Sequence, residues 1–248
     1  MANPMIGTAG WSIPAQHAAA FPSEGSHLER YSRRLSAVEI NSSFYRPHRP
    51  STYERWAATV PAHFRFAVKM PKEITHTRRL AQVAEPLARF LAEAGALGEK
   101  LGPILVQLPP SLAFKPDLAN FFHDLRTRFE GDIACEPRHR SWFTGEVDHQ
   151  LAEFRIARVA ADPAVVPRAA EPGGWQGLSY YRLHGSPRMY YSAYGRGALD
   201  ALAQRLAGHD GAAWCIFDNT AEGAATHEAM TLADILHRAG TGSSADRS

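Results

Sequence analysis

Charged side chains recur at the ends of β-like segments in this chain, in a combination that can carry acid–base chemistry. Glu136 and His184 are groups that commonly exchange protons with a substrate. Lys69 can act with them in catalysis and, together with Arg138 and Arg182, can hold an anion. The combination of Glu136, Lys69 and His184 therefore predicts catalysis on a small molecule that bears a phosphate or a carboxylate.

Further side chains lie at or just beyond the ends of the same segments. Side chains alternate along a strand, so residues two positions apart share a face. The pairs that share a face are Glu39 with Asn41, Glu136 with Arg138, and Arg182 with His184. Beyond the two arginines, the predicted substrate-binding residues are Glu39, Asn41, Gln107, Trp11, Tyr194 and Asn219.

Two other interpretations of these charges compete with an anion site. A buried ion network that only fills the interior is the structural alternative, because a single buried charge implies a partner rather than a function. Polar groups at the same end of several strands favour a site instead. A hard-metal site is the second alternative, although the neighbouring cations would repel a divalent metal and attract an anion. We expect no cofactor, and a divalent metal remains the alternative, with ligands from Glu39, Glu136, Asp162, Asp218 and a histidine.

The elements that must position these groups are short β-like runs alternating with helical stretches. Helical periodicity is clearest over residues 87–97, 118–125 and 230–236. This alternation predicts a parallel sheet with right-handed crossovers, so we predict the α/β class and a (β/α)8 barrel of the TIM type. Active sites of such barrels lie at the C-terminal ends of the strands. The expected strands, eight in number, are Met5–Thr8, Ala37–Ile40, Phe64–Lys69, Ile104–Leu108, Ile133–Glu136, Ile156–Ala160, Leu178–His184 and Ala213–Asp218.

Two loops interrupt or overhang the predicted barrel. The segment Ala161–Gly177 holds three prolines and three glycines where a sixth helix is expected, which predicts a loop in its place. Residues 184–195 carry Tyr190, Tyr191 and Tyr194 between glycines, which predicts a lid. We expect one barrel domain over residues 1–238 and a flexible tail over residues 239–248.

Composition and charge exclude several classes of protein. The 248 residues are 45% hydrophobic and 21% charged, which is ordinary globular usage. The formal net charge is +2, so no global basic field recruits nucleic acid. The two cysteines lie in apolar runs, and we find neither a signal peptide nor an apolar run of membrane-spanning length. We therefore expect a reduced, cytoplasmic protein without membrane contact.

Several stretches hold most of the residues named above: Ile6–Trp11, Val38–Tyr45, Phe64–Pro71, Gly102–Pro110, Glu136–Trp142, Tyr181–Gly185 and Phe217–Asn219. In sequence and order they resemble the YecE-like family, catalogued as domain of unknown function 72. The resemblance runs from residue 6 to about residue 236, and it implies a TIM-type barrel in a bacterial or archaeal cytosolic protein, with no established reaction. Two positions depart from the family pattern: Ala9 replaces the usual serine, and Asp218 replaces the usual asparagine.

We therefore expect an enzyme with hydrolase-like or lyase-like acid–base chemistry on a small anionic substrate. A barrel that binds or cleaves single-stranded nucleic acid is the alternative, because aromatic side chains beside a cationic rim bind single strands. Its support is Trp11, Trp142 and Trp175, and its weakness is the low net charge. A non-catalytic ligand sensor is a third possibility. Salt dependence separates the first two, since contacts to many phosphates weaken steeply with salt.

Overall fold

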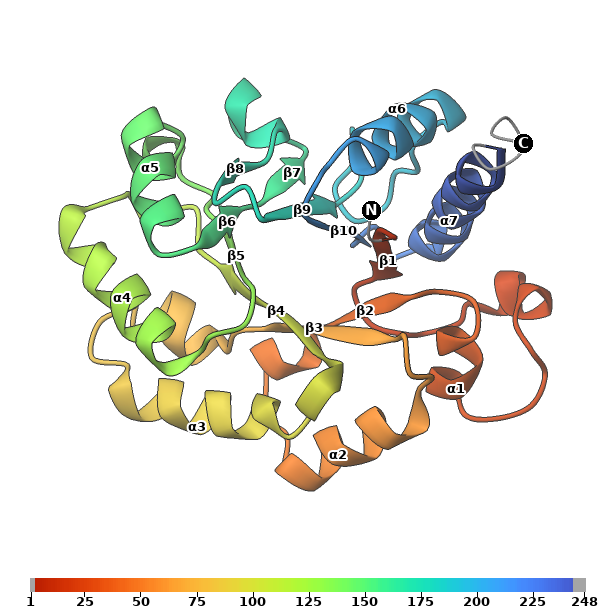
Figure 1. Cartoon of the computed structure of the whole chain (residues 1–248), viewed down its shortest axis with the longest axis horizontal. Coiled ribbons are helices and arrows are strands. Elements are labelled where there is room, and N and C mark those ends of the chain that lie inside the picture. Colours follow the sequence, from red (N-terminus) through yellow and green to blue (C-terminus); the bar gives the residue numbers. More distant parts are fainter. Residues whose placement is uncertain (1–2, 243–248) are drawn as a thin grey trace.

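Parallel strands form the centre of the molecule, and helices surround them (Figure 1). The structure is a computed structural model that describes residues 3–242. The strands are β1 (Met5–Thr8), β2 (Ala37–Ile40), β3 (Arg65–Lys69), β4 (Leu101–Gln107), β5 (Ile133–Glu136), β6 (Ile156–Arg158), β7 (Ala160–Asp162), β8 (Gly173–Gly174), β9 (Leu178–Leu183) and β10 (Ala212–Phe217). The α-helices are α1 (His27–Ser32), α2 (Pro50–Thr59), α3 (Ala84–Gly95), α4 (Ala119–Arg128), α5 (Gly145–Glu153), α6 (Arg196–Ala207) and α7 (Ala224–Gly242).

The strands are arranged in two sheets. One sheet has the order β1-β10-β9-β7, and the other has the order β2-β3-β4-β5-β6-β8. Within the described residues every pairing in these sheets is parallel except that of β8 with β6. The predicted α/β class with parallel strands is confirmed. The predicted closed barrel is found only in part, because the strands form two sheets rather than one continuous ladder.

Short connections join the two sheets at both seams. At one seam Ala9 forms a single parallel bridge to Glu39, and the N–H of Gly10 donates to the carbonyl of Glu39 at 2.9 Å. At the other seam the single strand predicted over Ile156–Ala160 is split into β6, which pairs with β5, and β7, which pairs with β9. Residues 156–162 therefore contribute one short strand to each sheet, and the strands follow one another around a common interior.

A buried tyrosine takes the place of backbone pairing between β1 and β2. The hydroxyl of Tyr31 accepts the N–H of Thr8 at 2.8 Å and donates to the carbonyl of Ala37 at 3.1 Å. Gly7 is required at this seam, because a Cβ there would lie 2.0 Å from the carbonyl oxygen of Ala37. The close approach of the two strands thus depends on a glycine and on the hydroxyls of Tyr31 and of Ser36, which accepts the N–H of Ile6 at 2.9 Å.

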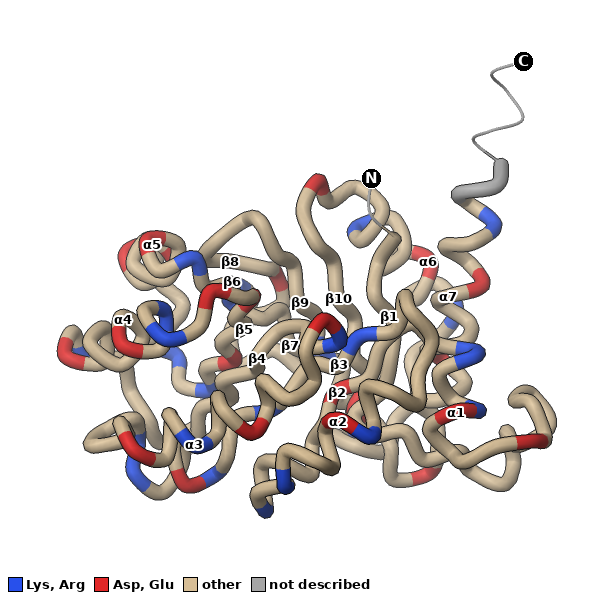
Figure 2. Tube along the Cα trace, turned by 60° about the horizontal axis from the view of Figure 1, so that its bottom comes forward, with Lys and Arg blue, Asp and Glu red and all other residues tan. Residues whose placement is uncertain are grey.

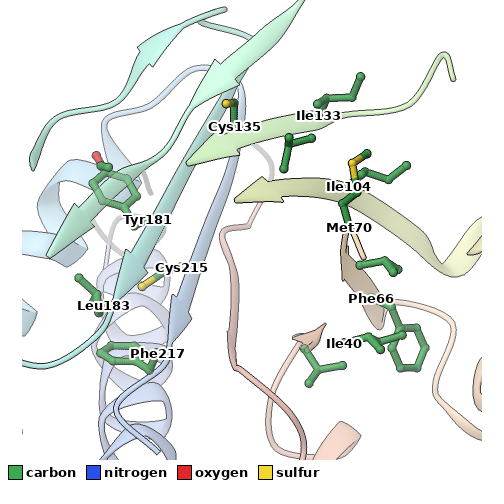
Figure 3. Close-up of a cluster of buried hydrophobic side chains, with 14 of the residues drawn as sticks. Ile40, Phe66, Met70, Ile104, Ile133, Cys135, Tyr181, Leu183, Cys215 and Phe217 are labelled. Carbon is green, nitrogen blue, oxygen red and sulfur yellow. The ribbon is translucent and has the colours of Figure 1, made fainter. Parts of the chain in front are cut away.

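The outer faces of the strands are apolar and pack against the helices. Leu183, Cys215 and Phe217 lie on one side of β9 and β10, next to a helical ribbon (Figure 3). They belong to the same core cluster as Leu199 of α6 and Ala229 of α7. Strand alternation therefore directs their neighbours in sequence toward the interior.

The inner faces change from apolar to polar toward the C-terminal ends of the strands. The apolar part includes Ala37, Ala67, Leu105, Ala134, Tyr180 and Ile216. Two residues further along the same strands lie Glu39, Lys69, Gln107, Glu136, Arg182 and Asp218, all of them buried. We call this second set the polar layer.

The expected sixth helix is replaced by a loop. Between β7 and β9 the described chain forms a 3-10 turn at Pro167–Ala170 and the short strand β8, and no α-helix. The buried guanidinium of Arg158 holds this loop: it donates to the carbonyls of Arg168 and Glu171, and it pairs with Asp148 of α5 at 2.6 Å.

The last helix extends further than the sequence indicates. Residues 239–242, which we expected to begin a flexible tail, belong to α7, because the helical hydrogen bonding continues beyond the last apolar repeat. Residues 243–248 of that expected tail lie outside the described residues. Across the part of the chain that is described, no helix combines the length and the apolar character needed to cross a bilayer.

We expect Tyr31→Phe to lower the free energy of unfolding by about 1–3 kcal/mol, because it leaves two buried backbone groups without a partner. Urea denaturation measures the change. Tyr53→Phe is the matched control: Tyr53 is 1% exposed, against 0% for Tyr31, and its hydroxyl makes no hydrogen bond within the described residues. Equal losses in the two variants would contradict the bridging role.

Candidate functional site

Arg182 of β9 lies at the centre of the polar layer and contacts three carboxylates. Its guanidinium makes a two-point contact with Glu39, with Nε–Oε2 at 3.0 Å and Nη2–Oε1 at 2.7 Å. Nη1 donates to Glu136 at 2.6 Å, and Nη2 donates to Asp218 at 3.1 Å. The planar fork of N–H donors suits such carboxylate contacts. Because one positive charge faces three negative ones, the layer needs further cations.

His184 lies between two of these carboxylates. Its Nδ1 lies 3.0 Å from Asp218, and its Nε2 lies 3.0 Å from Glu136. Burial opposes a charge on the ring, but the attraction of Glu136 and the hydrogen bonds to both carboxylates outweigh it and raise the pKa of His184. In the same way burial opposes ionisation of Glu136, yet Arg182 and His184 hold its pKa well below 4.5.

Glu136 and Glu39 receive further donors. Arg138 donates to Glu136, with Nη2–Oε1 at 3.0 Å, and the amide of Gln107 donates to Glu136 at 3.0 Å. The hydroxyl of Tyr180 donates to Glu39 at 3.0 Å. Our sequence analysis missed Tyr180, although its place two residues before Arg182 on the same strand could have indicated it.

Lys69 of β3 differs from the arginines because its Nζ forms no ion pair or hydrogen bond within the described residues. The side chain is 5% exposed, and Nζ lies 4.4 Å from the centre of the Phe44 ring. Burial and the charge of Arg182 lower the pKa of Lys69 to about 8, against the opposing pull of Glu39 and Glu136.

Positive charge extends from Lys69 toward the loops that follow β3 and β5. His76 lies in a π-helical turn at Glu73–Thr77. Its pKa is lowered by burial and by the charges of Lys69, Lys72 and Arg138. Lys72 is exposed and has no ion pair among the described residues. Several cations therefore act on one small region, and the carboxylates of the polar layer are already engaged.

A cavity of about 250 Å³ is lined by Lys72, one of these cations. Phe44, which contacts Lys69, lines the cavity together with Arg46 and Lys72. The acidic Glu73 in its lining is ion-paired with Arg78 and Arg89, whereas Glu93, also in the lining, has no ion pair among the described residues. The cavity therefore offers a small molecule an aromatic wall, the positive charges of Arg46 and Lys72, and one unpaired carboxylate.

Tyr194 does not reach the polar layer. Its hydroxyl accepts the N–H of Gly185 at 2.9 Å and donates to the carboxylate of Asp162 at 2.8 Å. The ring lines a separate cavity of about 280 Å³ between β7, β9 and α6. Tyr190 is the tyrosine that lies over the layer: its ring meets the ring of His184 edge-on at 6.0 Å, and its backbone adopts a φ of 69°.

Three other predicted binding residues also lie outside the hydrogen-bonded cluster. The amide nitrogen of Asn219 donates to Glu228 of α7 at 2.6 Å and to the carbonyl of Ser192 at 2.9 Å. It therefore anchors residues 184–195, which carry the three tyrosines and which we call the tyrosine loop. Asn41 keeps a buried oxygen without a partner in the described structure. Trp11 packs against another tryptophan, with ring centres 4.9 Å apart.

The structure thus brings most of the predicted site residues into one region. Those in direct contact with one another are Glu39, Gln107, Glu136, Arg138, Arg182 and His184. Sequence reasoning missed Glu228, which lies on the buried face of α7 and holds the Tyr194 backbone N–H. Its helical spacing from the buried Ala225 and Leu232 could have indicated it. Among residues 3–242, no group of three or more His, Cys, Asp or Glu side chains is arranged to hold a metal ion.

Fold and site together define an α/β protein with parallel strands and a charged inner layer at their C-terminal ends. Residues 5–247 match the family described as protein of unknown function DUF72, and the chain belongs to this family. The predicted resemblance is confirmed. The UPF0759 protein YunF of Bacillus subtilis is 29% identical over 163 residues, which is 61% of this chain. The matched part spans 56% of that relative's length.

Solved structures show the same fold. Crystal structures of DUF72 family proteins from Enterococcus faecalis and Thermotoga maritima have TM-scores of 0.79 and 0.78 at 20% and 22% identity. The matches cover 94% and 95% of this chain and 95% and 100% of those chains. A D-psicose 3-epimerase crystallised in the presence of D-fructose has a TM-score of 0.54 at 10% identity, covering 94% of this chain and 97% of that one. At these identities the likeness concerns the fold alone.

The raised pKa of His184 predicts a specific pH dependence of stability. A group whose pKa is higher in the folded state than its free value of 6.5 stabilises fully below that value, and the contribution is lost as the pH rises through the folded pKa. The difference in unfolding free energy between wild type and His184→Gln should therefore shrink above about pH 6.5, by up to about 1.4 kcal/mol for each unit of pKa elevation. Urea denaturation from about pH 6 to pH 9 measures this, with the exposed His149→Gln as the control. A difference that stays constant with pH would rule out a charged His184.

Proposed function

We propose that this chain is an enzyme that binds a small anionic molecule at the C-terminal ends of its strands and moves protons on it. The fold we propose is a (β/α)8 barrel whose sixth helix is replaced by a loop. One observation carries the proposal: the partly exposed guanidinium of Arg138 contacts both Glu136 and His184, with Nη2–Oε1 at 3.0 Å and Nη2–Nε2 at 3.2 Å. The lowered pKa of His76 supports it, because burial and the charges of Lys69, Lys72 and Arg138 disfavour the protonated ring, and a bound anion would offset those charges.

The arginines would have different roles. The guanidinium of Arg182 is fully buried, and its donors are used by Glu39, Glu136 and Asp218. Its role is therefore to orient the carboxylates. The side chain of Arg138 is 20% exposed and pairs with Glu136 alone among the carboxylates, so it keeps donors for an anion.

Proton transfer would use groups whose pKa values lie near neutrality. The pKa of Lys69, lowered to about 8, lets the amine lose and regain a proton under physiological conditions. His184, bonded to Glu136 and Asp218, is a second proton carrier. This combination supports the hydrolase-like or lyase-like chemistry expected from the sequence, with Lys69 as the base.

A nucleic-acid-binding barrel has less support. Trp142, which was expected to offer a stacking surface, is 0% exposed and donates to the carbonyl of Leu112. Trp175 packs under Arg155 near the start of β6, away from the C-terminal ends of the strands. Basic and acidic positions are interspersed along the chain rather than gathered into one basic stripe (Figure 2).

We expect wild type to bind inorganic phosphate in isothermal titration calorimetry at low salt, and Arg138→Gln to weaken the affinity about ten-fold or more, since a hydrogen bond to a charged group contributes about 1.5–3 kcal/mol. Arg128→Gln is the matched control, because Arg128 lies on the outer helix α4 and pairs with Asp124. Equal affinities in all three proteins, or no binding by wild type, would contradict the proposal. A single-stranded oligonucleotide that displaces phosphate with a steep salt dependence would favour the alternative.

A further inference from the structure

Lys69 has an environment that an ion-pairing role does not explain. Each carboxylate of the polar layer is within hydrogen-bond distance of Arg182, and two of them also contact His184. The amine of Lys69 lies instead over the face of Phe44 at 4.4 Å. Among the described residues it has no hydrogen-bond acceptor.

Burial and the neighbouring guanidinium make the neutral, nucleophilic form of this amine more accessible than that of an ordinary lysine. Removal from water destabilises the ammonium form, and so does the guanidinium of Arg182. The charges of Glu39, Glu136 and Asp218 act in the opposite direction and are outweighed, so the pKa of Lys69 falls to about 8. A lysine that is desolvated beside another cation is the arrangement that activates amines for attack on carbonyl carbon.

We infer that Lys69 forms an imine with a small carbonyl compound that carries a carboxylate or a phosphate group. The inference rests on the proposed function, because the cations around His76 would hold the anionic group. The Nζ lone pair forms the N–C bond, and one amine proton passes to the carbonyl oxygen. The C–O bond then breaks, and the second amine proton leaves with the hydroxyl as water, so the imine forms without any other reagent.

Space and composition agree with this assignment. The cavity of about 250 Å³ is lined by Phe44, the ring that the Lys69 amine contacts, together with Arg46 and Lys72, and it can accept a molecule of a few heavy atoms. Lysine is also scarce here: of 27 basic residues, only Lys69, Lys72, Lys100 and Lys115 are lysines. Arginine could supply charge at position 69, but it cannot form an imine.

The test is reductive trapping on the intact wild-type chain. The protein is incubated with pyruvate, or separately with dihydroxyacetone phosphate, in the presence of sodium borohydride at about pH 7, and each lysine is examined by peptide mapping and mass spectrometry. The neutral fraction of an amine with a pKa of about 8 is on the order of a hundred-fold larger at this pH than that of an ordinary lysine. After allowing for its lower intrinsic nucleophilicity, we expect Lys69 to be modified about ten-fold faster than Lys115.

Controls separate this inference from the proposed function. Acetone is a neutral carbonyl of similar size to pyruvate, and we expect at least about ten-fold slower trapping on Lys69, since it loses a charged contact. Lys69→Arg should abolish the adduct, whereas Arg128→Gln, on the outer helix α4, should change neither the adduct nor phosphate binding. The two anionic carbonyls distinguish a carboxylate from a phosphate as the preferred group.

The possible results of the trapping experiment lead to different conclusions about the imine and about the proposed function. Modification of Lys115 as fast as Lys69, or no adduct on Lys69 with either anionic probe, overturns the imine. Phosphate binding that depends on Arg138 would then still support the proposed function. An adduct on Lys69 that forms equally fast with acetone supports the imine and overturns the anionic class of the substrate. Because the mapping uses wild type, the result does not depend on the folding of a variant.

Discussion

The rest of the structure depends on the ion pairs that the buried guanidinium of Arg182 forms with three carboxylates. Arg182 lies on β9, in the four-stranded sheet, together with Asp218 after β10. Its other partners, Glu39 and Glu136, lie on β2 and β5 of the six-stranded sheet. Since the two sheets share few backbone hydrogen bonds at their seams, these ion pairs connect them across the interior. Buried ion pairs add little net stability, but loss of one partner leaves uncompensated charge, so the layer behaves as a unit.

Charge balance within this layer explains the shifted pKa values of two of its members. Three carboxylates contact Arg182, and two of them, Glu136 and Asp218, also contact His184 and raise its pKa. Arg138 engages Glu136 from the exposed side. Lys69 forms no ion pair or hydrogen bond among the described residues, so it is a buried amine whose pKa is lowered by burial and by the charge of Arg182. The anion site that we propose would use this positive region.

The tyrosine loop, residues 184–195, lies over this layer and is bonded to helix α7. Glu228 of α7 accepts the backbone N–H of Tyr194 and the amide of Asn219, which in turn holds Ser192. These contacts fix the loop ends and place Tyr190 against His184 in a left-handed backbone conformation that costs a non-glycine residue free energy. The loop is thus anchored to the outer helix and also to the ion cluster that it covers, since the N–H of Tyr190 donates to the carbonyl of His184 at 2.5 Å.

The sequence by itself determined the class of the fold and the membership of the polar layer. Strand alternation places Glu136 two residues after Ala134, on the same face of β5, and the apolar run Ile133–Cys135 before it predicts burial. Tertiary structure decided which partners meet. Alternation gives the face on which a residue lies but no distance between strands. It could not show that Arg182 would contact all three carboxylates while Lys69 contacts none of them. It also could not show that Tyr190 rather than Tyr194 would face the layer. It also could not show that the ladder breaks at two seams, because that depends on how closely strands far apart in sequence approach.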